Sequence, residues 1–116
     1  SLTSLSLNNG KFSGSLPPSW SNMLNLQNLH VRANRLQGSL PQEYSALSNL
    51  LNIDLGSNDI SGTLPASWAS LPALQHMNLD NQNLNGPLPA SWGALSNLHT
   101  LVMRRNQLSG PLPESW

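Results

Sequence analysis

Apolar and polar positions along this chain follow one pattern that recurs every 24 residues without an insertion or deletion. The pattern is LxxLxLxxNxLxGxLPxxWxxLxx, and its copies begin at Leu2, Leu26, Leu50, Leu74 and Leu98. A repeat of fixed length predicts a solenoid, in which each coil packs only on its neighbours. We therefore expect a single array of five repeats over residues 1–116, with the last repeat incomplete. We interpret the chain as a piece of a longer array whose neighbouring repeats would pack on these.

The first half of each repeat has the spacing of a short strand. In the third repeat Leu50, Ile53 and Leu55 fall at inward-facing positions, and Asn52 and Asp54 alternate with them and face outward. Because the chain advances in one direction through each coil, successive strands should stack in parallel. The five repeats together predict one curved parallel sheet.

The second half of each repeat predicts a tight corner, a second short strand and one helical or 3-10 turn. In the third repeat Gly62 permits the corner, Pro65 keeps the preceding residue extended, and Trp68 closes the turn. Pro87 and Pro111, in the fourth and fifth repeats, lack a backbone N–H, so the second ladder should weaken there.

Two columns of side chains should hold the coils together. Asparagines follow the strands at Asn34, Asn58 and Asn106, where an amide can pair with backbone groups that the turn leaves free. Gln82 takes this place in the fourth repeat, and its longer side chain predicts a looser turn. The aromatic column consists of Trp20, Tyr44, Trp68, Trp92 and Trp116. We expect it to be core, rather than a platform for stacking sugars, because its burial is favourable.

Composition narrows the functional classes. Charged residues make up 9% of the chain and the formal net charge is zero, which gives no general attraction to nucleic acid or anionic membranes. There is no cysteine, and no apolar run is long enough to span a membrane. None of the common nucleophile, metal-protease or phosphate-loop motifs occurs, so we expect neither an enzyme nor a cofactor.

These motifs resemble the leucine-rich repeat family. The 24-residue period with Ile60–Pro65 is similar to the plant-type subclass, which makes up receptor-like kinase ectodomains and wall-associated inhibitors. The variant at Leu64–Trp68 resembles repeats of protozoan promastigote surface antigens and algal repeat proteins. The resemblance implies a mostly β, α/β solenoid: a right-handed horseshoe with a parallel sheet on its concave face and short second strands and 3-10 or helical turns on its convex side. It also implies recognition outside the cell or at its surface.

The outward strand positions form columns on the predicted concave face, with one residue per coil. The candidate binding residues among them are His30, Arg32, Asp54, His76, Asn78, Asp80, Arg104 and Arg105. Asp80 and Arg104 lie in adjacent coils of one column, close enough to pair. His30, Asp54 and His76 could ligate zinc with an open position. A simple His30–Asp54 hydrogen bond is the more ordinary alternative, and we predict no metal site.

We therefore expect a non-catalytic module that recognises a protein or peptide through the concave face of a larger array. Five strands give a sheet of only about 400 Å², whereas a standard partner footprint is ~800 Å² per side. The alternative is a structural repeat rod or scaffold in a cell wall, coat or large assembly.

Overall fold

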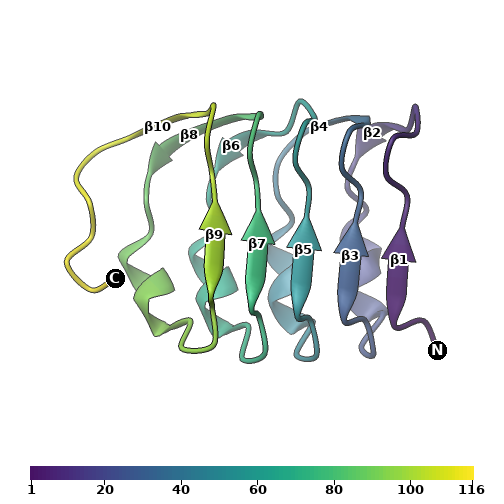
Figure 1. Ribbon diagram of the computed structural model, residues 1–116, viewed down its shortest axis with the longest axis horizontal. Helices are drawn as coiled ribbons and strands as arrows, with labels where there is room; N and C mark the ends of the chain where they lie inside the picture. Colours follow the sequence, from purple (N-terminus) through teal and green to yellow (C-terminus); the bar gives the residue numbers. More distant parts are fainter.

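The computed structural model describes residues 1–116 as a solenoid of five coils, which lie side by side from the N-terminus to the C-terminus (Figure 1). Each coil contributes one strand to a parallel sheet in the order β1-β3-β5-β7-β9. The strands are β1 Ser4–Ser6, β3 Asn28–His30, β5 Asn52–Asp54, β7 His76–Asn78 and β9 Thr100–Val102. Their register advances by one repeat per strand, as in His30↔Asp54↔Asn78. The columns predicted from the sequence are therefore real columns of the sheet.

Short second strands lie behind the first sheet. They are β2 Ser13–Ser15, β4 Arg35–Gln37, β6 Ser61–Thr63, β8 Asn83–Pro87 and β10 Gln107–Ser109. They form a pair β2-β4 and a three-stranded sheet β10-β8-β6, joined by an isolated bridge between Ser39 and Ser61. The expected weakening at Pro87 is wrong, because Pro87 pairs with Ser109 inside β8, the longest of these strands. Proline loses one donor but keeps a backbone angle that suits an extended chain.

Each Leu-Pro step leads into a single 3-10 helix. The helices are η1 Pro18–Asn22, η2 Gln42–Ala46, η3 Ala66–Ser70 and η4 Ala90–Ala94. Each begins directly after an extended proline and ends at a cap residue whose N–H donates to the carbonyl of the aromatic residue, as Leu71 does to Trp68. Each is five residues long, and the structure contains no helix that could cross a membrane.

The aromatic column lies in the core, as predicted. Tyr44 and Trp68 are 0% exposed and Trp92 is 3% exposed, while Trp116, with a neighbouring coil on one side only, is 46% exposed. Successive rings from Tyr44 to Trp116 stack 6.4–6.5 Å apart. The indole N–H of Trp68 also donates to the carbonyl of Pro41 in the preceding coil at 2.9 Å. The aromatic position therefore joins coils by stacking and by a hydrogen bond.

The asparagine column bonds the backbone within and between coils. Asn58 donates to the carbonyls of Leu55 in its own coil and Val31 in the preceding coil, and it accepts from the N–H of Leu36. Gln82 keeps both inter-coil bonds, to Leu55 and from Ile60. Gln82 makes no bond to its own turn.

The residue before the asparagine position of each coil, which Gly10 occupies in the first coil, adopts a left-handed backbone. These residues are Asn9, Ala33, Ser57, Asn81 and Arg105, with φ between 54° and 59°. The conformation aims the N–H of Ala33 at the carbonyl of Gly56 in the next coil, at 3.0 Å. The same φ at Asn81, beside Gln82, shows that the backbone turn there is no looser than in the other coils.

Candidate functional site

The candidate residues lie on the concave face, which we define as the outward side of the five-stranded sheet and of the turns that follow it. His30, Asp54 and Asn78 are half-buried at the ends of β3, β5 and β7, and His76 is exposed at the start of β7. The others follow the strands, and their exposure differs: Arg32 is half-buried, Asp80 is buried, and Arg104 and Arg105 are exposed.

One ion pair on this face joins two coils that are not neighbours. The guanidinium of Arg32, in the second coil, donates to both carboxylate oxygens of Asp80 in the fourth coil, at 2.9 and 3.4 Å. The residue between them in the same column is Gly56, and a Cβ placed there would overlap with both Arg32 Nη1 and Asp80 Oδ1. The missing side chain of Gly56 therefore lets Arg32 cross the third coil.

A small charge network surrounds this pair. Arg104 approaches Asp80 Oδ2 at 3.6 Å, which agrees with the predicted pairing in adjacent coils, and Arg32 lies 3.4 Å from Asp54 Oδ1. The hydrogen bond with Asp80, followed by the charges of both carboxylates, raises the pKa of Arg32. The Asp80 side chain is only 9% exposed, so this network keeps a nearly buried carboxylate paired.

Asp54 does not bond to His30, contrary to the expected hydrogen bond. Its Oδ1 instead caps the backbone N–H of Gly56, two residues along the chain, by accepting from it at 3.0 Å. The same oxygen also accepts from Arg32. Asn78 makes the same cap with the N–H of Asp80 at 3.0 Å. The chain shows no group of three His, Cys, Asp or Glu side chains placed to hold a metal ion.

Other side chains pair along the column formed by the first residue of each strand of the five-stranded sheet. The amide of Asn52 donates to Oδ1 of Asn28 at 2.6 Å, and His76 Nδ1 lies 2.7 Å from the hydroxyl of Thr100. The ladder is interrupted between Asn52 and His76, where neighbouring strands bring an amide beside an imidazole. Side chains are thus bonded in pairs, and a gap is left between the pairs.

The concave face also has a shallow hollow of about 300 Å³, which we call the dish. Its polar lining comes from four consecutive strands: His30, Asn52, Asp54, His76, Asn78 and Thr100. Ile53, Met77 and Val102 provide its apolar part. Sequence reasoning placed most of these side chains on one face. It missed the dish itself, and also the Arg32–Asp80 pair, for which the glycine at position 56 was the available signal.

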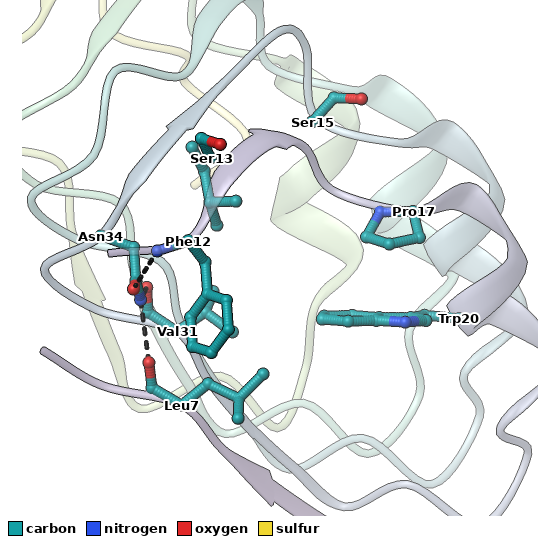
Figure 2. A pocket seen from close by; sticks show the side chains of 9 residues that line it. Leu7, Phe12, Ser13, Ser15, Pro17, Trp20, Val31 and Asn34 are labelled. Carbon is teal, nitrogen blue, oxygen red and sulfur yellow. Dashed lines mark hydrogen bonds between the residues drawn. The ribbon is translucent and has the colours of Figure 1, made fainter. Parts of the chain in front are cut away.

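A second hollow, of about 160 Å³, lies in the first coil (Figure 2). Figure 2 shows Phe12 beside Leu7 and Val31, with the Asn34 side chain accepting from the N–H of Phe12 and donating to the carbonyl of Leu7. Phe12 is 52% exposed, whereas Leu36, at the same repeat position one coil later, is 6% exposed. This hollow is therefore the core of a coil that has one neighbour, rather than a polar recognition site.

Comparison with known proteins agrees with this architecture. A family model described as "Leucine rich repeat" matches residues 24–84, and a second one of that description matches residues 1–23 and 97–116. No curated protein matches the chain by sequence.

Solved structures match along almost the whole chain. A plant peptide hormone receptor, RGFR1 in complex with RGF2, is 32% identical over 98% of this chain and 18% of the receptor chain, with a TM-score of 0.97. The Arabidopsis receptor kinase HAESA ectodomain, in complex with the IDA peptide hormone, is 33% identical over 98% of this chain and 20% of the HAESA chain, with a TM-score of 0.94. One chain of the Arabidopsis BIR3–SERK2 complex is 30% identical over 96% of this chain and 60% of its own length, with a TM-score of 0.92.

The chain spans about a fifth of the length of the two peptide receptor chains. The parallel sheet, the second strands and the 3-10 turns are those of a right-handed leucine-rich repeat solenoid. On its repeats and on these matches, the chain belongs to the leucine-rich repeat family.

Proposed function

We propose that this chain is a non-catalytic recognition segment that binds an extended peptide or a protein loop on its concave face. The observation that carries the proposal is the dish, because it gathers polar side chains with free hydrogen-bonding capacity from four consecutive strands. Concave sites with a few convergent polar groups are the usual binding sites of folded domains. Two structurally similar receptors at 32% and 33% identity were solved with peptide hormones, which supports a peptide as the partner.

The size of the face sets the expected affinity. Four steps of ~4.8 Å across five strands give about 19 Å, which is the length of about six extended residues. Such a ligand buries less surface than a standard interface, so we expect dissociation constants in the micromolar range or weaker for this chain alone. Neighbouring coils of a longer array would extend the contact.

The test is a selection of random 12-residue peptides on the immobilised chain, followed by titration of the selected peptides. We expect them to lose most of their affinity for the double variant His76→Ala with Asn78→Ala, which alters the dish. The matched control is Gln42→Ala with Glu43→Ala, two exposed polar residues on η2. If no peptide is selected, or if the η2 variant alone abolishes binding, the proposal is contradicted and the alternative of a structural rod is favoured.

We further propose that the parent protein exposes this segment at the cell surface, because the HAESA match is a receptor ectodomain. Protease treatment of intact cells that make the protein should then remove it, while a cytosolic marker survives. Full protection in intact cells, with digestion after lysis, would contradict this location.

A further inference from the structure

Asp54 carries an incompletely neutralised charge in the dish. It is the only Asp, Glu, Lys or Arg side chain among the residues that line the hollow. Its Oδ1 accepts from the N–H of Gly56 at 3.0 Å and from Arg32 at 3.4 Å, whereas Oδ2 makes no hydrogen bond. The side chain is 25% exposed, so this second oxygen is open to a ligand.

The neighbouring positive charges are committed to another partner. Arg32 makes its shorter contact, 2.9 Å, with Asp80, and Arg104 lies 3.6 Å from the same carboxylate. Arg32 and Arg104 together balance Asp54 and Asp80, so the network as a whole has no formal charge. Because Asp80 is the carboxylate that both guanidinium groups share, Asp54 is left as the weakly paired member.

Two amide oxygens of the dish can also accept hydrogen bonds beside Asp54. Asn52 uses its N–H group to bond to Asn28, so its own oxygen is free to accept. Asn78 Oδ1 takes one hydrogen bond from the N–H of Asp80 and has a second lone pair. A ligand group with several donors and a positive charge matches these acceptors better than a carboxylate or a phosphate does.

We propose that the dish is specific for a basic side chain, lysine or arginine, which a bound peptide inserts over Asp54 Oδ2. This inference rests on the proposed peptide-binding function and adds the chemistry of the residue recognised. The ligand cation donates to Asp54, and the oxygens of Asn52 and Asn78 accept its remaining N–H groups. Arg32 makes its shorter contact with Asp80 and reaches only Oδ1 of Asp54, so Oδ2 keeps no partner within the chain.

The Asp54→Asn variant tests the charge without disturbing the fold. Asn78 already makes the same backbone cap one coil further along, at the same 3.0 Å, so asparagine can keep the bond to Gly56. The matched control is Asp59→Asn, an exposed carboxylate outside the dish. Thermal unfolding of both variants should follow that of the original chain, which separates loss of binding from loss of structure.

The probes are the peptides selected on the original chain and the acetylated, amidated pentapeptide Gly-Gly-Lys-Gly-Gly with its acetyl-lysine counterpart. Binding is measured by titration and by backbone amide shifts of Asn52–Asp54 and His76–Asn78 in NMR spectra. We expect enrichment of lysine or arginine in the selected peptides. We also expect about tenfold weaker binding with Asp54→Asn or with acetyl-lysine, as for the loss of a partly exposed charged hydrogen bond, and no change with Asp59→Asn.

The outcomes separate this inference from the function on which it rests. Peptides that bind the concave face without basic residues, or equally well after Asp54→Asn, overturn the inference and leave peptide recognition standing. Absence of any peptide binding overturns both. A preference for basic peptides that Asp59→Asn removes as strongly as Asp54→Asn would show general charge attraction, and it would also overturn the assignment to the dish.

Discussion

Trp68→Ala probes the contribution of the aromatic column to stability. Trp68 is 0% exposed, stacks between Tyr44 and Trp92, and donates its indole N–H to Pro41. Truncating a buried aromatic side chain costs about 3–5 kcal/mol. The lost indole hydrogen bond costs about 0.5–1.5 kcal/mol, because the carbonyl of Pro41 keeps the N–H of Tyr44 as a donor. Because the two terms overlap, we expect the free energy of unfolding to fall by about 4–6 kcal/mol, a large share of the stability of a typical domain.

Urea unfolding followed by far-UV circular dichroism is the assay, because it follows the backbone, and the unfolding midpoint and slope are compared rather than the amplitude of the signal. Trp116→Ala is the matched control, since Trp116 makes the same bond to Pro89 but is 46% exposed and stacks on one ring. We expect it to cost less than half as much. Trp68→Phe keeps most of the stacking and should cost about 0.5–1.5 kcal/mol through the lost hydrogen bond. A loss below about 1 kcal/mol for Trp68→Ala would refute the view that this column supports the core.

Three further changes test other parts of the structure. Gly56→Ala should force Arg32 and Asp80 apart and lower the free energy of unfolding by about 1–2 kcal/mol. In a double-mutant cycle with Arg32→Gln, measured by urea unfolding, the destabilisation by the two substitutions together should be smaller than the sum of their separate effects. Burial raises the pKa of Tyr44 above its usual range. The stability that the neutral Tyr44 phenol contributes is thus fully present below about pH 10, the pKa of tyrosine in the unfolded chain, and is lost as the pH rises through the pKa in the folded chain. Absorbance at 295 nm would follow the ionisation, and unfolding at a series of alkaline pH values would follow the loss of stability. Ala33→Gly should raise stability by up to about 1 kcal/mol, because φ is positive there, and an unchanged or lower melting temperature would contradict this strain.

The sequence was sufficient to predict the coils, the sheet and the buried aromatic column. Each of these features depends on residues that recur every 24 positions, such as Trp68 and Trp92, so the reasoning for one repeat applies to all five repeats. Recurrence also made the order and register of the strands predictable, because a fixed repeat length allows only one way of stacking His30 beside Asp54.

The details of the binding face were less predictable, because they depend on residues that differ from coil to coil. The pair between Arg32 and Asp80 depends on the absence of a side chain at Gly56, and reasoning that considers only polar residues overlooks a glycine. Asp54 turned to a backbone N–H rather than to His30, since a local cap competes with a contact between strands. The left-handed backbone at Ala33 escaped prediction because no glycine or asparagine marks it.

The Arg32–Asp80 contact bears on how such an array can change its length. A solenoid whose coils touch only their nearest neighbours can lose or duplicate one unit and keep every remaining interface intact. Here a side chain of the second coil is fitted to a partner in the fourth, with the third reduced to glycine beneath it. Deleting the third coil, or inserting another beside it, would preserve the leucines and tryptophans while breaking this fit. These three coils therefore form a unit whose order is fixed, inside an array whose other coils can be exchanged.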